Sequence, residues 1–261
     1  MESQGLAVAL NVVMLGPPGA GKGTQSSRFA HARGIPKVAT GDILRQAVHD
    51  DTDIGRRVKT VMDRGELVND ELMTGIVRGR LNQPDAHRGF ILDGFPRTVA
   101  QAVTLDEMID GRGSLLVIDL VVPEAELVRR LSARMICAAC GANAGDFSSP
   151  PGAVGEKAIE KVMMPAAPGM AAVEAPAPAS ERCRVCGGPL VQRADDSDGV
   201  VRERLKIYHQ QTEPLVEYYR GRPTFRQVNG AQPPGRVAKE LATAVDAAHG
   251  VALSAGRGMA R

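Results

Sequence analysis

Tryptophan is absent from this sequence, and aromatic residues of all kinds make up only 3% of it. A packed interior therefore has to be built from aliphatic side chains and methionine. A strong net charge is also missing: the value of +2 gives no general attraction to nucleic acid or to a membrane surface. No apolar run reaches the roughly 18–20 residues that cross a bilayer. We therefore expect neither nucleic acid nor a membrane as a partner.

Features of secretion are equally scarce. The first ten residues carry Glu2 where a signal peptide has a basic segment, and their apolar run continues directly into a glycine-rich loop. We therefore expect a cytoplasmic protein. The sequence has only four cysteines, arranged as two Cys-x-x-Cys pairs. In a reducing compartment such pairs indicate a metal site in preference to a disulfide.

Short apolar runs alternate with helical stretches along most of the chain. Strands are predicted for residues 7–15, 89–92, 115–122 and 225–228. Helices are predicted for residues 24–33, 41–64 (as two short helices), 70–81 with Asn69 as N-cap, 123–135 and 236–249. This alternation predicts an α/β fold with a parallel β-sheet flanked by helices. The length of 261 residues suits one domain with insertions or two small domains.

The composition changes between residues 136 and 194. This stretch contains all four cysteines and an Ala/Pro-rich segment at residues 165–179 that has almost no charge and no strand or helix period. Such a composition favours a flexible or extended excursion. We interpret it as a passive spacer in preference to a partner-binding site.

A glycine-rich loop at residues 16–24, GPPGAGKGT, follows a predicted strand and precedes a predicted helix. It matches the pattern G-x-x-x-x-G-K, in which small residues let backbone N–H groups surround phosphates while the lysine reaches the outer phosphates. The loop predicts nucleotide binding on a P-loop NTPase fold, without specifying a reaction. The candidate phosphate-binding residues are Gly19, Ala20, Gly21, Lys22, Gly23 and Thr24.

Three further motifs follow in order: TGDILR at 40–45, DGFPRT at 93–98 with Gln101, and RERL at 202–205 with YH at 208–209 and TEPL at 212–215. Together with GPPGAGKGTQ they resemble the adenylate kinase family, over nearly all of residues 11–241 except the cysteine region. The resemblance implies a core of residues 1–39, 69–132 and 197–261. It also implies an AMP-binding insertion at 40–68 and a zinc-binding lid at 133–196.

The resemblance implies the substrates and the residues that bind them. AMP is expected at Thr40, Arg45, Glu66, Leu67, Val68, Gly94, Phe95, Pro96, Arg97, Gln101, Arg193 and Arg204. Mg·ATP is expected at the phosphate loop, Arg130, Arg134 and the backbone near Gln232. The residues expected to stabilise the transferred group are Lys22, Arg97, Arg134, Arg193 and Arg204. The reaction is then ATP + AMP giving two ADP, performed by a monomer.

The chemistry of these residues supports the implied roles. Planar, always-charged guanidinium groups suit the negative charge of two nucleotides and of the transferred phosphoryl group. The attacking phosphate oxygen is already ionised at pH 7, so catalysis needs positioning and electrostatics and no general base. Asp93, at the end of a predicted strand, suits a carboxylate that holds a magnesium-bound water. A kinase for UMP or CMP and a non-catalytic nucleotide-binding protein remain as alternatives.

Cys137, Cys140, Cys183 and Cys186 form two matching pairs, each followed by glycine. Four thiolates suit tetrahedral Zn²⁺, and a site with four protein ligands is structural, not catalytic. The pattern resembles the lid of zinc-containing adenylate kinases. Residues 141–182 make the interval between the pairs more than twice the usual length of about 15–20 residues. An iron–sulfur cluster or unbound thiols remain as alternatives.

Overall fold

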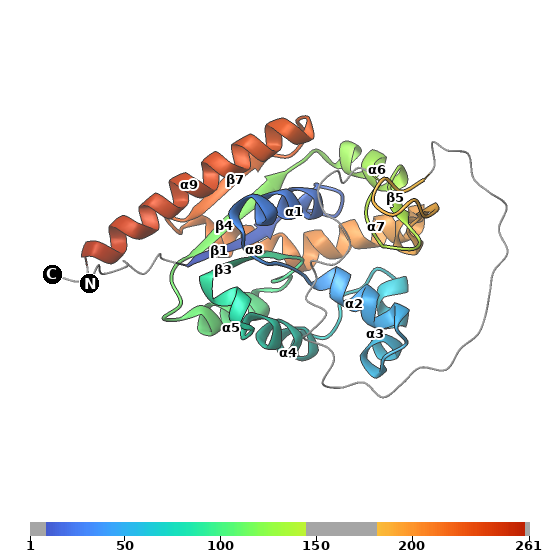
Figure 1. Ribbon diagram of the computed structural model, residues 1–261, viewed down its shortest axis with the longest axis horizontal. Coiled ribbons are helices and arrows are strands. Elements are labelled where there is room, and N and C mark those ends of the chain that lie inside the picture. Colours follow the sequence, from blue (N-terminus) through green and yellow to red (C-terminus); the bar gives the residue numbers. More distant parts are fainter. Residues whose placement is uncertain (1–8, 145–181, 259–261) are drawn as a thin grey trace. The chain divides into compact units, whose positions relative to one another are not determined.

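The computed structural model describes residues 9–144 and 182–258 (Figure 1). The chain divides into two compact units, Met1–Ser132 with Ala194–Arg261 and Ala133–Arg193, and each is described by itself. The predicted Ala/Pro-rich excursion at 165–179 lies outside the described residues. The assignment of an AMP-binding insertion and a lid is functional and stays a prediction.

The first unit is built on a five-stranded sheet in which all paired strands are parallel (Figure 1). The strand order is β2-β3-β1-β4-β7. The strands are β1 (Leu10–Leu15), β2 (Lys37–Ala39), β3 (Gly89–Asp93), β4 (Leu115–Val121) and β7 (Phe225–Asn229). The predicted α/β fold with a parallel sheet is therefore confirmed.

The helices of this unit connect the strands and cover the sheet. They are α1 (Lys22–Arg33), α2 (Thr40–His49), α3 (Asp53–Asp63), α4 (Asp70–Leu81), α5 (Val99–Ile109), α6 (Glu124–Ser132), α7 (Asp198–Ile207), α8 (Pro214–Arg220) and α9 (Pro234–Gly258). Short 3-10 turns occur at Pro84–Arg88 and Ala194–Asp196, and Tyr208–Thr212 is a π-helical turn between α7 and α8. Within the described part of the chain, even the 25-residue α9 lacks the combination of length and apolar composition that a membrane crossing requires.

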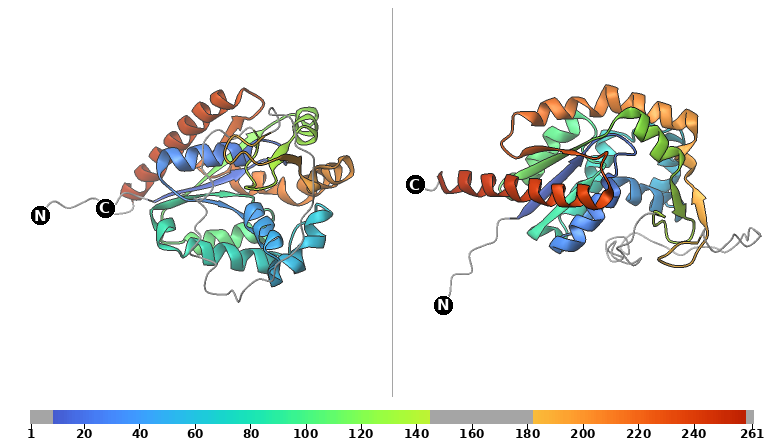
Figure 2. Two further views of the ribbon diagram at one scale, coloured as in Figure 1. Left: turned by 45° about the vertical axis from the view of Figure 1, so that its right-hand side comes forward. Right: turned by 90° about the horizontal axis from the view of Figure 1, so that it is seen from above.

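The alternation of side chains along β1 builds a core on each face of the sheet. Val12 and Met14 belong to a buried cluster with α1 and α9, whereas Val13 and Leu15 belong to another with α4 and α5. Figures 1 and 2 show these two pairs of helices on opposite faces of the sheet. A parallel strand that is buried on both faces reads as a continuous apolar run, which is why LNVVML signalled a strand in the sequence.

Most predicted elements are present, with some differences in extent. The Asn69 cap is confirmed, because its side-chain oxygen accepts the backbone N–H groups of Glu71 at 2.9 Å and Leu72 at 3.2 Å. The helix predicted for 123–135 ends at Ser132, and Met135 begins a strand instead. Strand β2 and helices α5, α7 and α8 were not predicted. The three residues of β2 are too few to show a period.

The second unit contains a two-stranded antiparallel sheet. Strand β5 (Met135–Cys137) pairs with β6 (Leu190–Gln192), in a register that places Met135 opposite Gln192 and Cys137 opposite Leu190. The sequence did not predict these strands, because each is three residues long. Their pairing brings the beginning and the end of the unit side by side.

Replacing either of two glycines by alanine should change the stability of the fold, in opposite directions. A Cβ atom on Gly55 in α3 would lie 1.9 Å from the carbonyl oxygen of Ala47 in α2, whereas a Cβ on the exposed Gly75 in α4 would meet nothing within 4 Å. Gly55→Ala should therefore lower the free energy of unfolding by about 2 kcal/mol or more, because the packed helices have to separate. Gly75→Ala should raise it by roughly 0.5–1 kcal/mol through helix propensity. Urea denaturation of both variants measures these changes, and equal stabilities would contradict the close packing of α2 against α3.

Candidate active site

The phosphate loop connects β1 to α1 and depends on glycine for its shape. Gly16, Gly19 and Gly21 have φ values of 128°, 85° and 94°, in the region that side-chain-bearing residues rarely adopt. At Gly16 a Cβ would also approach the Leu120 carbonyl oxygen to 2.7 Å. The loop is therefore fixed by both its backbone conformation and its contact with β4.

Lys22 is the first residue of α1 and its side chain folds back over the loop. Its Nζ donates hydrogen bonds to the carbonyl oxygens of Gly16 at 2.7 Å and Pro17 at 2.8 Å. The candidate phosphate-binding residues from Gly19 to Thr24 thus occupy the loop and the first turn of one helix. Backbone N–H groups at a helix N-terminus and an ammonium group form an anion-binding arrangement.

The parallel register brings two carboxylates to the same edge of the sheet as the loop. Asp93 ends β3 and pairs in register with Met14, and Asp119 of β4 pairs with Leu15. A Cβ on Gly23 would lie 3.4 Å from the Asp93 carboxylate, which therefore lies against the first turn of α1. This position suits the predicted magnesium role of Asp93, which stays a prediction.

Asp119 was not among the sequence candidates. Its side chain is buried, and its Oδ2 accepts a hydrogen bond from Gln227 Nε2 at 3.0 Å. Burial raises the pKa of Asp119, and the Gln227 hydrogen bond and the charge of Lys22 oppose this rise. A lone carboxylate inside the apolar run LLVIDLV was the available signal, because a buried charge is costly unless it has a partner.

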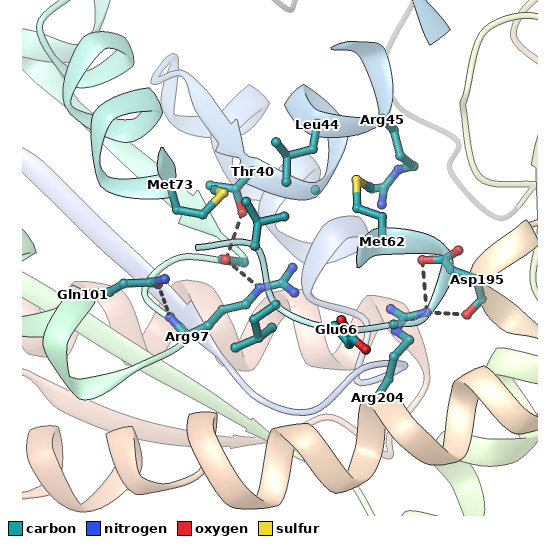
Figure 3. A pocket seen from close by; sticks show the side chains of 15 residues that line it. Thr40, Leu44, Arg45, Met62, Glu66, Met73, Arg97, Gln101, Asp195 and Arg204 are labelled. Atoms are coloured by element: carbon teal, nitrogen blue, oxygen red, sulfur yellow. Dashed lines mark hydrogen bonds and ion pairs between the residues drawn. The ribbon is translucent and has the colours of Figure 1, made fainter. Parts of the chain in front are cut away.

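A pocket of about 580 Å³, a volume that includes its open mouth, lies among α2, the end of α3, α4 and the loop after β3 (Figure 3). It brings together most of the predicted AMP-binding residues: Thr40, Arg45, Glu66, Leu67, Val68, Gly94, Arg97, Gln101 and Arg204. Apolar lining from Leu44, Met62 and Met73 was not predicted. Phe95 and Pro96 do not line the pocket, and Phe95 is 1% exposed in the core beneath it.

Arg97 is a partly buried, positively charged residue of the pocket lining. Its Nε donates to the Gly94 carbonyl oxygen at 2.8 Å, and its backbone N–H donates to Gln101 Oε1 at 2.7 Å (Figure 3). Burial lowers the pKa of Arg97 to about 10, and the positive charge of Arg204 contributes in the same direction. A cation that is both desolvated and repelled by another cation is stabilised by a bound anion.

The other two arginines of the pocket are held by carboxylates. Arg204 Nη1 donates to Asp196 Oδ1 and to the carbonyl oxygen of Asp195, both at 2.9 Å. The Asp196 side chain is completely buried and forms an ion pair with Arg204. Arg45 pairs with Asp42 one turn away on α2. These contacts hold guanidinium groups beside the pocket.

Arg130 and Gln232 both make contacts at the turn that follows β7. Arg130 Nη1 donates to the Gly230 carbonyl oxygen at 3.0 Å, and its Nε donates to Glu126 at 2.7 Å. The neighbouring Arg129 is 73% exposed and also pairs with Glu126, so the pKa of Glu126 falls to about 2. Gln232 donates through its side chain to Glu240 at 2.8 Å. Arg130, not Arg129, therefore contacts this turn, and the nucleotide roles of Arg130 and Gln232 stay predictions.

Arg134 and Arg193 belong to the second unit. Arg134 directly precedes β5 and Arg193 directly follows β6. Because Met135 lies opposite Gln192, both arginines are at the same end of the paired strands. Their predicted roles at the phosphates stay predictions.

The four cysteines of the second unit come together as predicted. Their sulfur atoms all lie within 4.8 Å of one another, with Cys137 Sγ 3.4 Å from Cys186 Sγ and Cys140 Sγ 3.6 Å from Cys183 Sγ. Tetrahedral zinc with Zn–S bonds of about 2.3 Å requires sulfur separations of about 3.8 Å. The backbone N–H of Cys140 also points at Cys137 Sγ, at 3.4 Å. The donor set and its spacing therefore fit a structural zinc ion.

Comparison with known proteins gives one consistent family. The family model "Adenylate kinase" matches residues 14–223. An adenylate kinase of Archaeoglobus fulgidus is 44% identical over 234 residues, which cover 89% of this chain and 96% of the relative. One from Moorella thermoacetica is 42% identical, covering 85% and 92%. One from Streptomyces avermitilis is 43% identical, covering 81% and 86%.

The cysteine cluster predicts a dependence of stability on metal. Cys183→Ser should lower the zinc content of the purified protein from about one equivalent to well below it, because one of four ligands is lost. The same change should lower the melting temperature. Ala138→Ser is the matched control, since it places the same hydroxyl on an exposed position beside the cluster without removing a sulfur. Normal zinc content and normal melting of the Cys183→Ser protein would refute the prediction.

Proposed function

Because the chain belongs to the adenylate kinase family, we propose that it transfers a phosphoryl group reversibly from Mg·ATP to AMP, giving two ADP. One observation carries this proposal. A phosphate loop and an arginine-lined pocket open at the same edge of one parallel sheet, where Asp93 lies against α1 and Gly94 lines the pocket. A phosphate-bearing donor and a phosphate-bearing acceptor thereby have adjoining sites.

The lining of the pocket suits a nucleoside monophosphate. Leu44, Met62 and Met73 offer apolar surface to a base, and Arg45 and Arg97 offer guanidinium groups to a phosphate. The lowered pKa of Arg97 reflects burial and the charge of Arg204, both of which an acceptor phosphate would offset. A bound anion is therefore worth more in this pocket than on an open surface.

The proposed mechanism relies on position and charge. Lys22 and the N–H groups of the loop hold the donor phosphates, while Arg97 and Arg204 stabilise the charge of the transferred group. Arg134 and Arg193, at the same end of the paired strands β5 and β6, are proposed to bind phosphate oxygens as well. The acceptor phosphate is ionised at neutral pH, so the reaction needs no side chain to remove a proton.

Two metals belong to the proposal. Thr24 and Asp93 are the residues that would orient magnesium bound with ATP, and the ion would supply positive charge to the donor phosphates. Zinc, held by the four cysteines, supplies structure to the second unit. We further propose that the chain acts in the cytoplasm, since the paired cysteines suit a reducing compartment, and that it acts as a monomer, as the resemblance of its motifs to the adenylate kinase family implies.

The choice of acceptor is testable directly. ADP formation by the purified protein should be measured with Mg·ATP and AMP, UMP, CMP or GMP in separate reactions. We expect turnover mainly with AMP. Turnover mainly with a pyrimidine nucleotide would keep the mechanism and overturn the acceptor, and no turnover with any acceptor in folded, zinc-loaded protein would leave a nucleotide-binding protein.

Lys22 provides a test of the donor site. Lys22→Ala should reduce kcat by at least about a thousandfold, because the developing charge on the transferred group loses its nearest ammonium. Lys239→Ala, at an exposed position of α9, is the control for loss of one lysine and should leave kcat unchanged. Near-normal turnover in the Lys22→Ala protein would exclude the phosphate loop as the donor site.

A further inference from the structure

The side chain of Gln101 lines the pocket but is only 2% exposed, and both ends of its amide are hydrogen-bonded. Its Oε1 accepts from the backbone N–H of Arg97 at 2.7 Å, as Figure 3 shows. Its Nε2 donates to Asp70 Oδ1, also at 2.7 Å. Asp70 is the first residue of α4 and does not line the pocket.

These two partners allow only one orientation of the amide. A backbone N–H can only donate, and an ionised carboxylate can only accept. Rotating the amide by half a turn would place Nε2 against the Arg97 N–H and Oε1 against the Asp70 carboxylate, losing both hydrogen bonds and leaving buried polar groups unpaired. Asp70 itself is fixed, because its Oδ2 accepts from Thr98 Oγ1 at 2.8 Å.

A side-chain amide with a fixed orientation can distinguish two bases whose hydrogen-bond donor and acceptor occupy exchanged positions on the ring edge. Gln101 keeps one N–H hydrogen and one lone pair beyond those that Asp70 and Arg97 occupy. A 6-amino purine offers a donor at position 6 and an acceptor at N1, and a 6-oxo purine offers the reverse. An amide free to rotate would match either, whereas a locked amide matches one.

We propose that Asp70 is a specificity-determining positioning residue: by locking the amide of Gln101, it makes the pocket accept a 6-amino purine and reject a 6-oxo purine. This inference rests on the proposed function, because it assumes that the pocket holds the acceptor base. Asp70 acts through Gln101 and has no contact with the substrate.

The test compares AMP with IMP, which differ only at position 6 and at the N1 proton. The wild-type protein should prefer AMP in kcat/KM by at least about a hundredfold. Asp70→Asn introduces an amide that can accept or donate, and Asp70→Ala removes the acceptor. Each should reduce the preference for AMP by about tenfold or more, mainly through a lower KM for IMP and a higher KM for AMP. The Arg97 N–H remains in both variants, so part of the preference should survive.

Glu71→Gln is the matched control. Glu71 is the next residue of α4, is exposed, and carries the same charge in the same first turn of the helix. This variant should keep the wild-type ratio of AMP to IMP. Melting temperatures of all three variants separate a change in selectivity from a loss of folded protein.

Several outcomes would overturn the inference. One is a wild-type protein that uses IMP as well as AMP, and this measurement requires no variant to fold. Another is an equal loss of kcat/KM for both nucleotides in the Asp70 variants, since a merely structural role lowers both alike. If the wild-type protein turns over neither nucleotide, the proposed function fails, and calorimetric titration with AMP and with IMP then tests the locked amide by binding alone: equal affinities would exclude it.

Discussion

The hydrogen-bonded register of the parallel sheet determines which residues meet at its functional edge. Met14 and Ala39 both pair with Asp93, and Leu15 pairs with Asp119. The segments that leave β1, β2 and β3 therefore begin together, and they carry the phosphate loop, Thr40 and Gly94. A shift of one residue in any of these pairings would exchange the side chains that a strand contributes to the two buried clusters, and would disrupt the packing of both. The packing of the core and the geometry of the site are thus set by the same interaction.

The same edge of the sheet gathers several positively charged side chains in one pocket. Arg97 is desolvated and lies near a second guanidinium, which is why its pKa is lowered. Arg204 is compensated by Asp195 and by the buried Asp196. With the proposed function, a phosphate-bearing ligand would relieve the remaining repulsion, and its binding would also stabilise the folded protein. Without a bound anion, the positive charges of Arg97 and Arg204 repel one another in this pocket.

The sequence predicted those features that arise from local patterns. Apolar runs located β1, β3, β4 and β7, and the side chain of Asn69 identified the start of α4. Local spacing identified each Cys-x-x-Cys pair, and the preference of zinc for four thiolates predicted that the two pairs come together. The prediction failed where structure arises from contacts between distant segments. Strand β2 forms only through its pairing with β3. The carboxylate of Asp70 at the start of α4 meets Gln101 of α5, 31 residues further along the chain. No pattern within one segment could reveal either contact.

The pairing of β5 with β6 has a consequence for how this chain can vary. Because Met135 lies opposite Gln192, the polypeptide enters and leaves the second unit at neighbouring points. A segment whose ends lie close together can be replaced or lengthened without moving the residues before and after it. The entropy of closing a loop grows only with the logarithm of its length, and the four sulfur atoms lie within 4.8 Å of one another despite the long interval between the pairs. Inserting further residues between the two cysteine pairs should therefore lower the free energy of unfolding only slightly.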